Sequence, residues 1–372
     1  MRIGLIFHNF GGYHVARLRG AAQVARERGW TIEGIEIEQS TTEHPWGAIV
    51  ADDELVKHTV EPGDAKLSRF LSDQNFDALA IPGWGFSYSR KALAWCRRNR
   101  KPAVLMSESK FNDEPRSWWK EWLKSGLVRQ FSSAIVGAQA HEDYLVRLGM
   151  ERSSIHRGYD IVDNDYFAKG ADEARENPAT ARARTPAIPG RPFFLSASRF
   201  IERKNLETLL YAYAEYLNQA GDDYWELILA GSGQTEPRLF VLARELKLEG
   251  KISFPGFISY KEMPAWYGLA GGFVHPARAE QWGLVVNEAM AAGLPVAVSR
   301  TCGCFPELID EGKTGYGFNP GSVSELAELL IKIAKNDQFT MALAGRRHVA
   351  DKFGPHHFGK GLLKAVEASI DQ

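Results

Sequence analysis

The sequence lacks the features of a secreted, disulfide-stabilised or membrane-spanning protein. Its 372 residues include only three cysteines, Cys96, Cys302 and Cys304, which are too few for a disulfide framework. Cys302 and Cys304 could form a redox or metal-binding pair, but no second ligand pair accompanies them, and a structural role is favoured. No window approaches the ~18 unbroken apolar residues of a membrane-spanning helix. The apolar run 3–7 is too short for a signal peptide, so we expect a cytoplasmic protein.

The sequence also has no charge excess and no common nucleotide-binding fingerprint. The 45 basic and 46 acidic residues leave a net charge of −1, which argues against nucleic acid as a partner. The turn after the first apolar run, Asn9–Gly12, contains neither G-x-G-x-x-G nor Gly-Lys-Ser/Thr, which disfavours dinucleotide and P-loop sites. Gly12 could still let a phosphate approach the helix that follows, although a plain tight turn explains it equally well.

Apolar runs alternate with amphipathic segments along the whole chain. In the first half, helices separate predicted strands at 3–7, 31–37, 78–81, 103–106 and 134–136. A second series begins at Phe193 and continues through predicted strands at 226–230, 251–254 and 273–275. This alternation predicts an α/β protein with two Rossmann-like domains, each built on a parallel sheet.

Composition suggests the domain boundaries. Residues 168–191 are rich in Ala, Arg, Glu and Pro and show little apolar periodicity, which predicts a linker. The first domain would then span 1–167 and the second 192–356. The last predicted helix, 357–370, has no obvious place in the second sheet, and we expect it to pack back on the first domain.

The stretch 275–298 combines a strand end, a loop, a helix and another strand. The loop carries Glu280 and Gly283, and the predicted helix 284–292 carries Glu288. Free N–H groups at a helix start can hold an anion, so the backbone of Gly283, Leu284 and Val285 could hold a diphosphate. Glu288 fits a ribose diol and Glu280 fits the hydroxyls of a sugar. From spacing alone, two unrelated glutamates on a surface helix are equally plausible.

The order of several motifs resembles that of the family-four retaining glycosyltransferases, which have the GT-B fold. Glu280 and Glu288 stand in the family's Glu-x7-Glu signature, and Ser198-Arg199 with Lys204-Asn205 resembles its Gly-Arg…Lys-Gly element. Further similar motifs follow in the family's order, at 231–233, 255–257 and 303–315, with a similar hinge at 158–167. The resemblance covers the second domain strongly and the first weakly. It implies two Rossmann-like domains that face each other across a cleft.

The resemblance also implies a reaction and its residues. Arg199 and Lys204 would bind the diphosphate. Together with Glu280 they are the candidate catalytic residues. The base would lie near Ser232, Gly233, Phe257 and Ile258. The resemblance implies that the anomeric configuration is retained, by front-face attack, and that no enzymic nucleophile, metal or cofactor is needed. We expect a nucleoside-diphosphate sugar as donor, and we favour a UDP-sugar because UDP-sugars are the more frequent donors in the family. The expected acceptor is a glycan, a lipid-linked molecule or a small molecule.

The acceptor side departs from the family pattern. The family often has a histidine after the fourth strand of the first domain, where this chain has Ser107-Glu108-Ser109. Glu108 and His14 are therefore the acceptor-side candidates. The sequence Asp163-Asn164-Asp165 matches a metal-binding D-x-D element, but it lies at the hinge, and we expect no metal there. Another GT-B nucleotide-sugar enzyme, such as an epimerase, and a non-catalytic nucleotide-sugar-binding protein are the alternative functions.

The segment 97–129 is locally basic and rich in tryptophan. It contains nine Lys or Arg against four acidic residues, with Trp118, Trp119 and Trp122 among them. Such a helix could lie on the anionic inner face of a membrane or stack against a sugar acceptor. The favoured interpretation is that its tryptophans pack into the domain.

Overall fold

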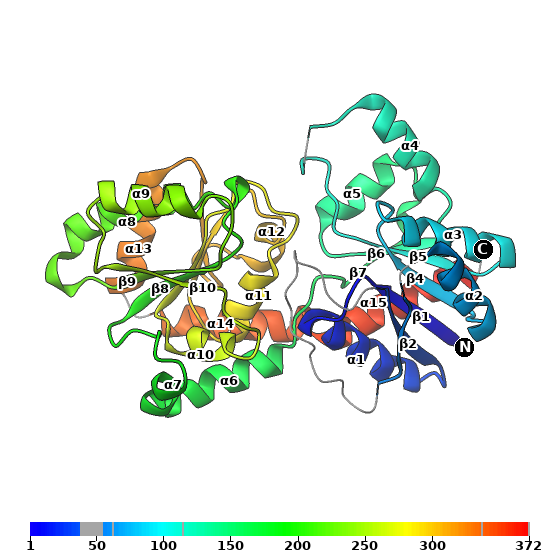
Figure 1. Ribbon diagram of the computed structural model, residues 1–372, viewed down its shortest axis with the longest axis horizontal. Helices are drawn as coiled ribbons and strands as arrows, with labels where there is room; N and C mark the ends of the chain where they lie inside the picture. The colour runs from blue at the N-terminus through cyan, green and yellow to red at the C-terminus, as the bar shows by residue number, and fades with distance from the viewer. Residues whose placement is uncertain (38–54, 62, 114, 336–337, 371–372) are drawn as a thin grey trace. The chain divides into compact units, whose positions relative to one another are not determined.

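The computed structural model describes residues 1–37, 55–61, 63–113, 115–335 and 338–370 (Figure 1). The chain forms two compact units: Met1–Asp163 with Phe353–Gln372, and Asn164–Lys352. Each unit has one parallel sheet with helices on both faces. This confirms the predicted fold class of two Rossmann-like domains. Among the described helices, none is both long and apolar enough to cross a membrane.

The sheet of unit 1 has seven strands in the order β3-β2-β1-β4-β5-β6-β7. Their bounds are β1 Arg2–Phe7, β2 Thr31–Glu36, β3 Lys57–Thr59, β4 Ala78–Pro82, β5 Ala103–Ser107, β6 Ser133–Val136 and β7 Ile155–Arg157. The central strands are buried on both faces, as continuous apolar runs require. One face packs on α1 (Gly12–Arg26) and α15 (Pro355–Ile370). The other packs on α2 (Asp64–Gln74), α3 (Ser87–Asn99) and α5 (Gln139–Arg147).

Helices α1 and α15 approach each other through glycine. A Cβ atom on Gly20 would lie 2.0 Å from the carbonyl oxygen of Pro355, and one on Gly359 would lie 2.4 Å from the carbonyl oxygen of Gly20. Both contacts are with backbone, which cannot move aside as a flexible side chain could. The last helix is thus joined to unit 1 by a contact that accepts no side chain on either glycine.

The sheet of unit 2 has six strands in the order β10-β9-β8-β11-β12-β13. Their bounds are β8 Phe193–Ala197, β9 Glu226–Ala230, β10 Ile252–Gly256, β11 Gly272–His275, β12 Val296–Ser299 and β13 Tyr316–Phe318. The helices between and after them are α8 Leu206–Ala220, α9 Glu236–Glu245, α10 Met263–Leu269, α11 Leu284–Ala291, α12 Phe305–Leu308, α13 Val323–Lys335 and α14 Phe339–Lys352. Because all pairs are parallel, the carboxyl ends of the strands meet at one edge, where such sheets bind ligands.

The range 168–191, which the sequence analysis assigns to a linker, lies within unit 2 and is largely helical. It carries most of α6 (Asn164–Glu176) and all of α7 (Pro178–Arg184). Alanine, arginine and glutamate favour helix, and a proline is accepted at the first helical position. On α6, Asp172 bonds to Arg346 at 2.6 and 2.9 Å, and Arg175 bonds to the carbonyl oxygen of Ala292 at 2.5 Å. The apolar periodicity of this range is weak because α6 is held in place by these polar contacts as well as by a narrow apolar stripe.

Replacing Gly359 by alanine should destabilise unit 1. The new Cβ would overlap the backbone of α1, and overpacking of this kind costs about 1–3 kcal/mol. Gly126→Ala is the matched control, because a Cβ there meets nothing within 4 Å and alanine favours helix. Thermal and urea unfolding would measure both. Equal effects of the two substitutions would contradict the close approach of α1 and α15.

Candidate functional site

An ion pair stands at the carboxyl edge of the unit 2 sheet. Lys204 ends a short 3-10 turn, Glu202–Lys204, that follows β8, and Glu280 lies in the loop after β11. Strands β8 and β11 are hydrogen-bonded neighbours, so the two loops meet. The Nζ atom of Lys204 contacts a carboxylate oxygen of Glu280, and both side chains are about nine-tenths buried. Two predicted catalytic residues, far apart in sequence, are therefore in direct contact.

A residue that the sequence analysis missed, His275, adjoins this pair. It ends β11, is fully buried, and its Nε2 atom lies 3.6 Å from the Glu280 carboxylate. Burial lowers the pKa of His275. Burial alone would raise the pKa of Glu280, but His275 and Lys204 outweigh it and hold that pKa well below its usual range. The position of His275 directly at a strand end was the signal in the sequence that could have revealed it.

Asn205 fixes the position of Lys204. It adopts a left-handed conformation with φ of 57°. Its Nδ2 atom donates to the carbonyl oxygens of Pro276, at 3.0 Å, and Pro320, at 2.8 Å. Its Oδ1 atom accepts from Thr208 at 2.8 Å and from Arg278 at 2.7 Å. One side chain thus ties the loop after β8 to the loop after β11, a role that the sequence motif Lys-Asn did not reveal.

The two cysteines after β12 support the Glu280 loop. Both Cys302 and Cys304 are buried thiols that form no disulfide. Glu280 pairs with Cys302 through an isolated parallel β-bridge, and the N–H of Gly303 donates to the carbonyl oxygen of Glu280 at 3.1 Å. A Cβ on Gly303 would lie 1.6 Å from the carbonyl oxygen of Gln281. In the described part of the chain, no group of three or more His, Cys, Asp or Glu side chains could hold a metal ion.

Helix α11 begins beside the ion pair. Gly283 precedes it with φ of 109°, a conformation that favours glycine. A Cβ there would lie 3.3 Å from His275 Nε2. Leu284 and Val285 are partly exposed at the helix start. The helix N-terminus and the Lys204–Glu280 pair therefore lie at the same place on the sheet edge.

Glu288, the predicted ribose ligand, is almost fully buried. It lies on α11, is 2% exposed, and accepts a hydrogen bond of 2.7 Å from the Tyr267 hydroxyl on α10. Contact of Glu288 with a ribose stays a prediction.

The other donor-side candidates follow neighbouring strands of the same sheet. Arg199 follows β8 and is exposed, and among the described residues its guanidinium makes no hydrogen bond or ion pair. Ser232 and Gly233 follow β9, and the Ser232 carbonyl oxygen accepts from the N–H of Phe200 at 2.8 Å. Phe257 and Ile258 follow β10, with Phe257 exposed. All of these candidates stand at the carboxyl edge of the unit 2 sheet.

The acceptor-side candidates belong to unit 1 and differ in exposure and contacts. Glu108 follows β5, is partly exposed, and lies 3.5 Å from the buried Arg17 guanidinium. Arg17 also lies 3.6 Å from the buried Asp160, and burial together with Glu108 raises the pKa of Asp160 well above its usual range. His14, by contrast, accepts a hydrogen bond of 3.0 Å from the N–H of Gly11 at the start of α1. Gly12 is the first residue of that helix and is buried.

Residues 179–347 match the family model of the glycosyl transferases group 1. The matched range contains the Lys204–Glu280 pair, the start of α11 and every donor-side candidate except Gly12. Unit 2 therefore carries the group 1 glycosyltransferase sequence pattern.

Individual relatives point to the same class. The chain is 24% identical over 294 residues to the 2-deoxystreptamine N-acetyl-D-glucosaminyltransferase of Niallia circulans, covering 76% of this chain and 74% of that protein. It is 30% identical over 198 residues to a GDP-mannose-dependent phosphatidylinositol monomannoside mannosyltransferase of Mycobacterium tuberculosis. That match spans 50% of this chain and about half, 51%, of the relative. These relatives are glycosyltransferases that differ in donor and acceptor.

A solved structure shares the fold over the full length. The crystal structure of Anabaena HepE in complex with UDP-glucose has a TM-score of 0.77 and 18% identity, with 99% of both chains covered. At this identity the likeness shows the fold alone. The chain thus has the two-domain α/β fold of GT-B glycosyltransferases.

Glu280 should make the stability of the protein depend on pH. Its pKa is lower in the folded chain than in the unfolded chain, so its ionisation stabilises the fold above its ordinary pKa and loses that effect as pH falls. The loss of unfolding free energy caused by Glu280→Gln should therefore be about 1 kcal/mol smaller at pH 3.5 than at pH 7. Urea unfolding at both pH values measures this difference. Glu328→Gln, at an exposed site on α13, is the control, and the same pH dependence in both variants would contradict the assignment.

Proposed function

We propose that the protein is a retaining glycosyltransferase. It moves a sugar from a nucleoside-diphosphate sugar to a glycan, lipid-linked or small-molecule acceptor, and needs no metal or cofactor. The observation that carries the proposal is the buried Lys204–Glu280 pair beside the start of α11. A carboxylate, a cation and a helix N-terminus at one sheet edge suit a sugar joined to a diphosphate. The match of residues 179–347 to the group 1 model supports the same conclusion.

Each group has a role that fits its surroundings. Glu280 is held ionised and accepts hydrogen bonds from donor-sugar hydroxyls. Lys204 and the exposed Arg199 bind the diphosphate, whose charge grows as the bond to the sugar breaks. Their contribution is therefore greatest in the transition state. The acceptor oxygen bonds to the anomeric carbon on the face that the diphosphate leaves. The acceptor proton passes to the departing phosphate oxygen, which explains why no separate base is needed.

The proteins that resemble this chain differ in the base of the donor. The curated mannosyltransferase relative is named as GDP-mannose-dependent, whereas HepE was solved with UDP-glucose. We favour UDP-sugar, with the base near Ser232, Gly233, Phe257 and Ile258 and the ribose at Glu288. The exposed ring of Phe257 offers a stacking surface for a base. On the acceptor side we favour Glu108 over His14, because His14 is engaged at the start of α1. We also propose a cytoplasmic location.

Removing either member of the ion pair should abolish most turnover. We expect Lys204→Met and Glu280→Gln each to lower kcat/KM by about 100-fold or more, the effect of losing a transition-state charge contact. Release of nucleoside diphosphate from a panel of UDP-, GDP- and ADP-sugars would measure this loss and identify the base. Arg203→Gln, at the exposed neighbour of Lys204, should retain activity within about twofold.

A stability control keeps this test decisive. Lys204→Met alone leaves Glu280 buried without its cation, which destabilises proteins. The double variant Lys204→Met/Glu280→Gln removes both charges, so it should recover stability and still lack turnover. Recovery of turnover in the double variant would show that the pair stabilises the fold without taking part in transfer.

The configuration and origin of the product separate transfer from the alternative functions. A retaining transferase consumes donor in step with acceptor and gives a product with the donor's anomeric configuration, which NMR reads directly. Turnover without an acceptor, with the nucleotide product still carrying the sugar, would instead indicate an epimerase. Tight donor binding by calorimetry, with neither hydrolysis nor transfer to any acceptor, would indicate a non-catalytic nucleotide-sugar-binding protein.

A further inference from the structure

Helix α4, Trp118–Val128, exposes a large apolar face. The exposed fraction is 83% for Trp118, 49% for Trp119, 71% for Trp122 and 51% for Leu123. These positions lie on one side of the helix, because residues four apart share a face. Soluble proteins seldom leave such a contiguous apolar surface uncovered unless something binds it. This face is therefore a candidate binding surface.

The helix is attached to unit 1 by its polar side. Glu121 accepts a hydrogen bond of 2.9 Å from the Tyr144 hydroxyl of α5, and the Ser125 hydroxyl donates to the carbonyl oxygen of Leu148 at 2.6 Å. Val128 is the buried residue of α4. The favoured expectation, that the tryptophans pack into the domain, is wrong. The helix instead turns Glu121 and Ser125 toward the domain and its tryptophans outward. Figure 1 shows it at the periphery of unit 1.

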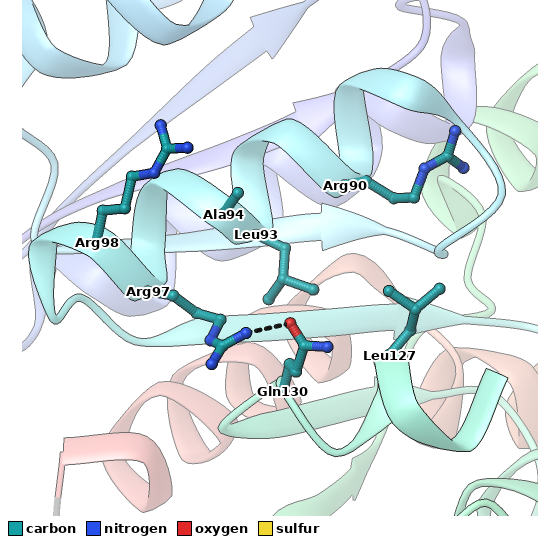
Figure 2. Close-up of a pocket in the computed structure, with 7 residues that line it drawn as sticks. All are labelled: Arg90, Leu93, Ala94, Arg97, Arg98, Leu127 and Gln130. Carbon is teal, nitrogen blue, oxygen red and sulfur yellow. Dashed lines mark hydrogen bonds between the residues drawn. The ribbon is translucent and has the colours of Figure 1, made fainter. Parts of the chain in front are cut away.

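A basic groove adjoins this apolar face. It has a volume of about 370 Å³ and is lined by Arg90, Leu93, Ala94, Arg97 and Arg98 of α3, with Leu127 and Gln130 (Figure 2). Leu127 is on α4, one turn after the exposed Leu123, so the groove continues from the tryptophan face. Arg97 donates to Gln130 at 2.6 Å, and Arg90 donates to the carbonyl oxygen of Gly85 at 2.7 Å. Within the described chain, none of the three arginines is paired with a carboxylate.

We propose that α4 and the arginine groove bind an anionic lipid surface. Tryptophan side chains are suited to the boundary between headgroups and acyl chains, because each has an apolar ring and one N–H donor. Arginine binds phosphate through its planar fork, so the groove accepts the headgroup of an acidic phospholipid while the tryptophans enter the boundary layer beside it. The two surfaces meet at Leu127, which lets one membrane engage both.

Charge favours lipid over a second copy of the chain. Residues 97–129 carry nine basic and four acidic side chains, and a symmetric dimer through this face would bring the arginine grooves of both copies together. An anionic surface instead neutralises them. The contact is independent of the proposed transfer reaction, because neither α4 nor the groove contains a residue of the unit 2 site.

Vesicle co-sedimentation of the full-length protein tests this inference. We expect binding to phosphatidylcholine vesicles that contain phosphatidylglycerol, weakened by salt, and little binding to phosphatidylcholine alone. Trp118→Gln/Trp122→Gln should weaken binding roughly tenfold or more. Arg90→Gln/Arg97→Gln/Arg98→Gln should weaken it on the order of 100-fold, at roughly one factor of five per basic residue. Because the substituted side chains are exposed, the melting temperature should stay close to that of the parent protein.

Matched controls remove equal apolar or basic groups elsewhere. Val241→Gln/Phe339→Gln replaces two exposed apolar residues of unit 2, and Arg69→Gln/Lys360→Gln/Lys364→Gln removes three exposed charges from unit 1. Neither should change vesicle binding more than about twofold. If the control triple variant and the groove triple variant weakened vesicle binding equally, binding would depend only on the net charge of the protein. That result would overturn the inference. So would absence of binding to anionic vesicles, or a concentration-dependent dimer that the double tryptophan variant abolishes.

Discussion

The candidate site depends on one buried ion pair, Lys204 with Glu280. Removing two charges from water is costly, and the cost is recovered only when the partners and neighbouring dipoles are well placed. Here His275 supplies a third polar group 3.6 Å from Glu280. The low pKa of Glu280 follows from this arrangement, because its neighbours stabilise the ionised form more than burial disfavours it. A buried carboxylate that stays ionised is well suited to accept hydrogen bonds from the hydroxyls of a sugar.

The scaffold around the pair fixes both partners before a ligand arrives. Asn205 joins the loops after β8 and β11 through its hydrogen bonds to Pro276 and Arg278, while the Cys302–Cys304 segment pairs with the Glu280 loop. Such preorganisation matters because groups that are already positioned need not reorganise as charge develops. Gly283 and Gly303 leave room for this close packing because they have no side chain. These uncharged residues therefore also support the Lys204–Glu280 pair.

Unit 1 buries polar groups at one place and exposes apolar groups at another. At the carboxyl edge of its sheet, Arg17 and Asp160 are almost fully buried, and Glu108 reaches the surface beside them. At the periphery, α4 turns its polar side toward α5 and leaves three tryptophans exposed. The first arrangement positions a carboxylate where parallel sheets bind ligands, and the second creates a surface that water does not favour. Both are departures from ordinary burial, and such departures mark the places where function is to be sought.

The sequence by itself determined the two parallel sheets, because apolar runs that alternate with amphipathic segments are compatible with few other folds. It also placed Glu280 and Gly283 close together after the end of a strand. Only the tertiary structure placed Lys204 on Glu280 and revealed His275, Asn205 and the support from Cys302, because those contacts join loops distant in sequence. It also placed residues 168–191 in helices and the tryptophans of α4 outside. Local patterns report which residues form a helix and which side is apolar. They do not report which side faces the domain, because that depends on the partners across the contact, here Tyr144 and the carbonyl oxygen of Leu148.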